Sequence, residues 1–248
     1  LTLLLRREPG GLRRYAHLGT GNYHPRTARL YEDFGLFTGD PDICADVHEV
    51  FRRLTGTGQA VDLRCLLQAP FTLAAHVLAA IKREADAARE GRRAYIAAKV
   101  NALLEPAVIE ALYQASQAGV KIDLIVRGVC ALRPGVPGLS ETIRVRSVIG
   151  RFLEHSRIYH FHAGGRDEVW LASADWMGRN FYRRVEVAFP VRDRRLKARV
   201  LSEGFAVHLR DNASAWTMDA EGGYVRRRPR GLRTIVSQQA LLEKLAAK

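Results

Sequence analysis

The chain is poor in cysteine and contains no long apolar run. Its 248 residues include three cysteines, Cys44, Cys65 and Cys130, none of them in a CxxC pair. This spacing favours neither a disulfide framework nor a zinc site. No run of about 18 apolar residues is present, so we expect no transmembrane segment. The opening LTLLLRREPGG is too short for a secretory signal. We therefore expect a cytoplasmic protein, and its charge leaves peripheral membrane association open.

Acidic residues are also scarce relative to basic ones. Lys and Arg number 39 against 26 Asp and Glu, which gives a net charge of +13. A surplus of this size favours a polyanionic partner such as nucleic acid, an anionic membrane or phosphate, without saying which. The arginines cluster most densely in RRRPRGLR, residues 226–233. Such a run suits phosphate oxygens but is equally typical of a solvated face.

Apolar patterning predicts an α/β protein. Alternation of apolar residues predicts strands at 2–6, 12–18, 94–100, 120–126, 143–148, 157–162, 168–173 and 184–190. Helical periodicity predicts helices at 41–54, 72–90, 106–119, 193–208 and 235–246. The order strand, helix, strand over 94–126 indicates a crossover between parallel strands. The turn GTGQ at 56–59 separates a leading segment, 1–56, from a longer α/β unit, and that segment alone is too small to close a core.

Two histidines stand beside turns of small residues. His17 ends an alternating strand and is followed by the turn Gly19 to Asn22, and His155 and Arg157 begin a strand whose neighbour ends in another such turn. A neutral imidazole can attack phosphorus, a second one can protonate the leaving oxygen, and glycine turns offer backbone N–H groups to phosphate. The sequence therefore suggests phosphoryl transfer through histidine, although a single histidine at a strand end is more often a structural hydrogen-bonding group. The GxxxxGK[ST] string of a P-loop is missing.

Several long strings resemble one family. HLGTGNYHPRTARLYEDFGLFT, IDLIVRGVC, IRVRSVIGRFLEHSRIYHF and SADWMGRN, in this order, are similar to the C-terminal half of bacterial polyphosphate kinases, members of the phospholipase D-like superfamily. The resemblance implies a phospholipase D-like mixed sheet flanked by helices. It makes residues 1–56 the end of a first such domain, and residues 57–248 a second, complete domain with a basic C-terminal tail. The family's N-terminal and head domains have no counterpart in this sequence.

The resemblance also implies roles for particular residues. It makes His17 the autophosphorylated nucleophile and His155 a second histidine that contacts nucleotide phosphate and assists proton transfer. Arg127 of IVRG corresponds to a phosphate-binding arginine, and Phe51, or its neighbour Val50, lies about where an aromatic residue packs near adenine. The superfamily's HxK pattern has lysine where this chain has Arg157, which keeps the charge and changes its geometry. A carboxylate orients each histidine in this chemistry, and Glu186 of RRVEV is a candidate.

The implied activity is reversible transfer of the terminal phosphate of ATP to polyphosphate through a phosphohistidine. We expect ATP or ADP and inorganic polyphosphate as partners, no nucleic acid, and a homo-oligomer in the full-length form. We also expect Mg²⁺ to neutralise the nucleotide phosphates, with the family's metal-associated arginines lying upstream of residue 1. Two alternatives stay open at this point: a phospholipase D-like phosphodiesterase or nuclease, and an inactive truncated fragment that binds polyanions.

Overall fold

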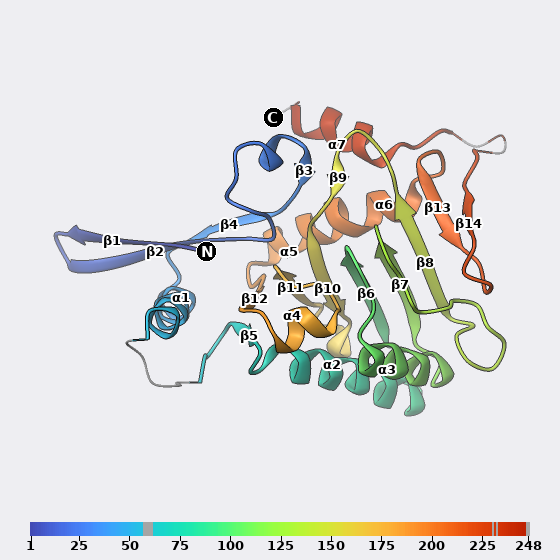
Figure 1. Cartoon of the computed structure of the whole chain (residues 1–248), viewed down its shortest axis with the longest axis horizontal. Coiled ribbons are helices and arrows are strands. Elements are labelled where there is room, and N and C mark those ends of the chain that lie inside the picture. Colours follow the sequence, from blue (N-terminus) through green and yellow to red (C-terminus); the bar gives the residue numbers. More distant parts are fainter. Residues whose placement is uncertain (57–61, 230, 232, 247–248) are drawn as a thin grey trace.

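The core of the molecule is one large mixed sheet (Figure 1). The computed structural model describes residues 1–56, 62–229, 231 and 233–246. The sheet has nine strands, in the order β14 (Tyr224–Arg226), β13 (Ala215–Met218), β8 (Ile143–Val148), β7 (Lys121–Val126), β6 (Tyr95–Val100), β10 (Arg157–Phe161), β11 (Glu168–Ala172), β12 (Glu186–Pro190) and β5 (Leu67–Ala69).

The centre of this sheet is the predicted crossover. Strands β6, β7 and β8 are parallel, and helix α3 (Pro106–Gln117) connects β6 to β7. Helix α2 (Leu73–Arg89) packs beside α3, and both cover one face of the sheet with a buried apolar core. The remaining neighbours in the sheet are antiparallel. The prediction of a mixed α/β fold with parallel strands over 94–126 is confirmed.

The second face of the sheet carries the leading segment of the chain. A three-stranded sheet of β1 (Thr2–Glu8), β2 (Gly11–Gly19) and β4 (Gly35–Thr38) precedes α1 (Pro41–Leu54). Side chains of β2 and α1 share a second apolar core with β10, β11 and β12. Helix α1 begins where Asp40 accepts the backbone N–H groups of Asp42 and Ile43, a typical N-cap.

A two-stranded parallel pair joins the leading segment to the rest of the chain. Its strands are β3 (Tyr31–Glu32) and β9 (Leu153–Glu154). Elsewhere the chain forms η1 (Thr27–Arg29), η2 (Ala163–Gly165), α4 (Gly178–Tyr182) and, near the C-terminal end, α7 (Ser237–Ala246). Because β9 leads directly into β10, this pairing holds residues 31–33 beside His155.

All eight predicted strands and all five predicted helices form. The helix predicted at 193–208 is a continuous helical stretch made of α5 (Arg194–Val200), the π-helical segment η3 (Leu201–Ala206) and α6 (Val207–Arg210); the π-helical middle was not predicted. Gly204 lies in this segment directly against Ile158 of β10 and leaves no room for a side chain. Sequence patterning did not predict the six short strands β3, β4, β5, β9, β13 and β14. The predicted break at 56–59 lies largely outside the described residues, as do Arg230 and Leu232 of the basic run.

Candidate active site

His155 lies in a cluster of polar side chains, between β9 and β10. Its side chain is buried, and its Nδ1 lies 2.9 and 3.0 Å from the two carboxylate oxygens of Asp33. Asp33 follows β3, so the β3–β9 pairing brings it to His155. A carboxylate at Nδ1 selects the tautomer that carries its proton there, which leaves Nε2 as the chemically active nitrogen. Asp33 therefore fixes the orientation of the His155 imidazole.

A buried guanidinium lies next to this imidazole. Arg157 donates through Nε and Nη2 to the two oxygens of Asp175, both at 3.1 Å, and its Nη1 is 3.1 Å from Nε2 of His155. The same Nη1 donates to the carbonyl of Thr20, also at 3.1 Å, in the turn that follows β2. Two-point pairing with a carboxylate fixes the planar fork. Arg157 is therefore positioned to place positive charge at Nε2 of His155.

Arg127 belongs to the same cluster. Its Nε donates to Oδ1 of Asn101 at 3.1 Å, and Nδ2 of Asn101 donates to the carbonyl of His155 at 3.4 Å. Burial lowers the pKa of the Arg127 guanidinium, Asp175 opposes that shift, and Arg157 adds to it. A guanidinium stays protonated even so. The structure thus brings two predicted residues, His155 and Arg127, close together through Asn101.

Two members of the site were not predicted from the sequence. The ring of Tyr31 packs against the imidazole of His155 with 4.6 Å between ring centroids, and Asp33 binds its Nδ1. Both lie in the string ARLYEDF, which carried the family resemblance but offers no periodic signal of its own. The predicted carboxylate, Glu186, is wrong for this role. It accepts hydrogen bonds from Ser173 and Asn180, and no hydrogen bond or ion pair of the described residues joins it to His155 or His17.

A buried ionic network stabilises the strands that position His155. Lys99 of β6 is fully buried and donates to Glu32 at 2.8 Å and to Glu154 at 2.5 Å. Burial alone would lower the pKa of Lys99, but the two carboxylates raise it by a larger amount, so the net shift of this pKa is upward. Glu154 also bonds Nε2 of His208 at 2.9 Å, and Gln238 of α7 donates to its other oxygen at 2.8 Å. Because Glu32 and Glu154 belong to β3 and β9, this network fixes the pairing that holds Asp33 against His155.

His17 has different surroundings. Its Nδ1 lies 2.6 Å from the hydroxyl of Tyr23, and its ring packs against Phe37 with 4.4 Å between centroids. A Cβ on Gly35 would lie 2.6 Å from Nε2, so this nitrogen faces the Gly35 backbone at close range. Burial lowers the pKa of His17, which favours its neutral form. Two positions after His17 the chain has Gly19 and no cation. Neither a hydrogen bond nor a ring contact of the described residues joins His17 to His155.

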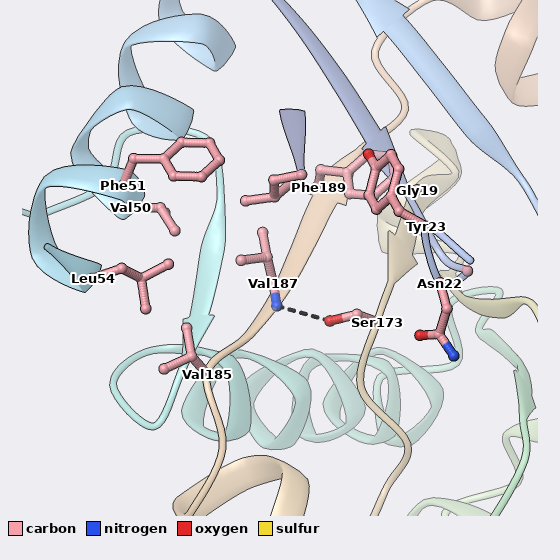
Figure 2. Close-up of a pocket in the computed structure, with 12 residues that line it drawn as sticks. Gly19, Asn22, Tyr23, Val50, Phe51, Leu54, Ser173, Val185, Val187 and Phe189 are labelled. Carbon is pink, nitrogen blue, oxygen red and sulfur yellow. Dashed lines mark hydrogen bonds between the residues drawn. The ribbon is translucent and has the colours of Figure 1, made fainter. Parts of the chain in front are cut away.

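Phe51 lines an apolar pocket of about 320 Å³ next to the turn that follows His17 (Figure 2). Figure 2 shows Val50, Phe51 and Leu54 of α1 facing Val187 and Phe189 of β12, with Asn22, Tyr23 and Ser173 on the opposite side. Gly21 of the same turn adjoins the Asp33 carboxylate so closely that a Cβ would collide with it. Phe51 and the HLGTGN turn thus form a pocket that adjoins the His155 cluster through Gly21 and Asp33.

No three His, Cys, Asp or Glu side chains of the described residues converge as a metal cage requires. Of the acidic groups near His155, Glu32 and Glu154 are paired with Lys99, Asp175 is paired with Arg157, and Asp33 accepts hydrogen bonds from His155 and Thr20. The described part of the chain also has no helix both long and apolar enough to cross a membrane.

Comparison with known proteins supports one family across the chain. A family model described as polyphosphate kinase C-terminal domain 2 matches residues 66–238, and one for C-terminal domain 1 matches residues 1–60. Polyphosphate kinase of Burkholderia vietnamiensis is 65% identical over 232 residues, which cover 92% of this chain and 34% of that protein. Polyphosphate kinase of Paraburkholderia phytofirmans is 59% identical over the whole chain, which covers 36% of that protein.

A solved structure agrees with these sequence relatives. The crystal structure of polyphosphate kinase from Porphyromonas gingivalis matches 99% of this chain with a TM-score of 0.93 and 39% identity, and the match covers 38% of that chain. The present chain therefore spans about a third of the length of the relatives it matches. With its fold and most of its length shared, the chain belongs to the polyphosphate kinase family and corresponds to the family's C-terminal domains.

Proposed function

We propose that this chain forms the His155 centre of an ATP:polyphosphate phosphotransferase, and that the whole protein transfers the terminal phosphate of ATP reversibly to polyphosphate. The observation that carries the proposal is an imidazole oriented by a carboxylate at Nδ1 and flanked at Nε2 by a fixed guanidinium. ATP or ADP and inorganic polyphosphate are the proposed partners. Residues 1–56 and 57–248 are the proposed parts of the first and second catalytic domains.

The proposed reaction has two balanced steps. A histidine nitrogen attacks the terminal phosphorus of ATP, so that an N–P bond forms, the bridging P–O bond breaks and ADP leaves. A terminal oxygen of polyphosphate then attacks the same phosphorus, so that a P–O bond forms and the N–P bond breaks. Arg127 and Arg157 would stabilise the charge on the transferred phosphoryl group. We expect Mg²⁺ to enter with the nucleotide, because the described residues include no cage of their own for it.

The proposed roles of His155 and His17 rest on different kinds of evidence. His155 is favoured as the group that meets phosphate, because Nδ1 is held by Asp33 and Nε2 is flanked by Arg157. The assignment of His17 as the nucleophile stays a prediction from the family resemblance. Since Nε2 of His17 faces the Gly35 backbone, its ring must turn before phosphorus can approach that nitrogen. Phe51 stays a proposed nucleotide contact, supported by the apolar pocket that it lines.

Labelling with [γ-³²P]ATP tests these roles in the full-length enzyme that contains this chain. If His17 is the nucleophile, His17→Ala abolishes an acid-labile, base-stable label. Label retained in His17→Ala would assign the nucleophile to another histidine. His155→Ala should slow net transfer by about 10²- to 10⁴-fold, the contribution of a general acid or base. An unchanged transfer rate in His155→Ala would contradict the proposed centre, and hydrolysis of phosphodiesters without ATP would favour the phosphodiesterase alternative.

A further inference from the structure

The backbone around β9 is paired on both of its edges, on one by β3 and on the other by a single side chain. Toward β3, the backbone N–H of His155 donates to the carbonyl of Glu32 at 3.2 Å. The backbone of Phe152 faces the other edge. Its N–H donates to Oε1 of Gln238 at 3.0 Å, and its carbonyl accepts from Nε2 of Gln238 at 2.8 Å. The Gln238 amide therefore takes the place that a neighbouring strand would have on this edge.

The same amide also contacts the buried ionic network. Nε2 of Gln238 donates a second hydrogen bond to Oε1 of Glu154, at 2.8 Å. Both protons of the amide nitrogen and its oxygen are thus used, which fixes the orientation of this buried side chain. Gly150 lies so close to the amide that a Cβ there would collide with Oε1 of Gln238. Gln238 therefore fits in one place, between Gly150 and β9.

Helix α7, which carries Gln238, lies beside β9 (Figure 1) and is buried at its first turn. Its buried residues are Ser237 and Gln238. Further along the helix, Leu242 and Leu245 stay 38% and 48% exposed. They line a cavity of about 410 Å³ that residues 31–35 also line, so apolar contact between the later turns of α7 and β3 is incomplete. The contact of α7 with β9 therefore depends on the Gln238 amide more than on apolar packing.

We propose that Gln238 is a positioning residue of the His155 centre. From α7 it holds the backbone of Phe152 and the carboxylate of Glu154, which keeps β9 paired with β3. That pairing places the Asp33 carboxylate at Nδ1 of His155. The inference rests on the proposed function, because it takes His155 as the group that meets phosphate. It extends the centre to the last helix of the chain.

The test compares Gln238→Met with Gln239→Met in the full-length enzyme that contains this chain. Methionine keeps the unbranched shape of glutamine and removes the amide. Gln239 is exposed, and its amide donates to Glu243 of the same helix at 2.9 Å. We expect Gln238→Met to lower kcat for transfer from ATP to polyphosphate by about tenfold, the lower end of what one hydrogen bond to a charged group contributes. The KM for ATP should stay unchanged, because no hydrogen bond of the described residues joins Gln238 to Arg127. Gln239→Met should match wild type in both constants.

Gly150→Ala disturbs the same amide from its other side. The added Cβ pushes Oε1 of Gln238 away from Phe152 and leaves the glutamine itself in the chain, so kcat should fall as in Gln238→Met. This variant decides the outcome if Gln238→Met does not fold.

A double variant, Asp33→Asn with Gln238→Met, separates positioning from a loss of folded protein. If Gln238 acts through the contact of Asp33 with His155, the loss of kcat in the double variant is smaller than the product of the two single losses. A lower folded fraction would instead multiply with the effect of Asp33→Asn.

Three results would overturn the positioning role: a wild-type kcat in both Gln238→Met and Gly150→Ala, an equal loss in Gln239→Met, or losses that multiply in full in the double variant. The proposed function has a separate failure, which is wild-type enzyme that transfers no phosphate. Crystallography of Gln238→Met then decides the positioning role by itself. Asp33 displaced from Nδ1 of His155 would support the role, and an unmoved pair would contradict it.

Discussion

The orientation of His155 by Asp33 gives the sharpest prediction. Asp33→Asn keeps the shape of the side chain but removes the charge that accepts the Nδ1 proton at 2.9 and 3.0 Å. The amide can present its NH₂ group to Nδ1, which selects the opposite tautomer and moves the proton to Nε2. Asp33 also accepts a hydrogen bond from the hydroxyl of Thr20 at 2.7 Å, so the substitution loosens the β2 turn as well.

The size of the effect follows from these contacts. A hydrogen bond to a charged group contributes about 1.5–3 kcal/mol. At about 1.36 kcal/mol for each factor of ten, its loss corresponds to a roughly 10- to 100-fold decrease in the transfer rate. The assay is the initial rate of phosphate transfer from ATP to polyphosphate by the full-length enzyme, with the phosphoenzyme level measured in parallel. The misplaced proton should lower the rate at every substrate concentration, because it affects the chemical step.

A matched control pairs with a histidine on β10, the strand of Arg157. Asp167 accepts from Nε2 of His160 at 2.9 Å, the same pairing of residue types, at the other end of β10. Asp167 has φ of 49°, a conformation that asparagine tolerates well. Asp167→Asn should therefore leave transfer unchanged. Transfer by Asp33→Asn at the wild-type rate, or an equal loss in both variants, would refute the role of Asp33 in orienting His155.

Three further predictions concern other parts of the site and the fold. Arg127→Ala should raise the KM for ATP by about tenfold, as expected for loss of one charge-assisted phosphate contact; an unchanged KM would mean that this guanidinium serves only to hold Asn101. Gly21→Ala should reproduce the rate loss of Asp33→Asn, because the added Cβ collides with the Asp33 carboxylate. Crystallography of the variant should show Asp33 displaced. A wild-type rate would show that the turn moves and leaves Asp33 in place. The hydrogen bond from His76 and the nearby Arg83 lower the pKa of Glu168 from 4.5 to about 2 despite its partial burial. Glu168 therefore stabilises the fold above about pH 4.5 and loses this contribution as the pH falls towards 2. In urea titrations, Glu168→Gln should be less stable than wild type at neutral pH, and the difference should shrink with acidification over that range; a difference independent of pH would contradict the assignment.

The sequence predicted those parts of the fold that rest on local periodicity. The crossover over 94–126 has an apolar strand, a proline-opened helix and a second apolar strand, and each signal is contained within a few residues. The pairing of β3 with β9 has no such signal, because two-residue strands show no alternation and their partners lie more than 120 residues apart. The carboxylate that orients His155 could not be predicted for the same reason. Glu186 was a plausible candidate by its position near the second motif, whereas Asp33 reaches His155 through tertiary structure alone.

The β3–β9 pairing also constrains the order in which the molecule can assemble. Lys99 lies in the middle of the central sheet, and one of its two carboxylate partners, Glu32, arrives only when the leading segment docks. Before that event, the sheet holds an ammonium group with a single carboxylate to compensate it, an arrangement that is costly in a dry interior. Contacts at such sequence separation form late, since the loop between them must close first. Completion of the proposed His155 centre and neutralisation of this buried charge are consequently one folding event, so a chain with an unformed site is also a chain with a destabilised sheet.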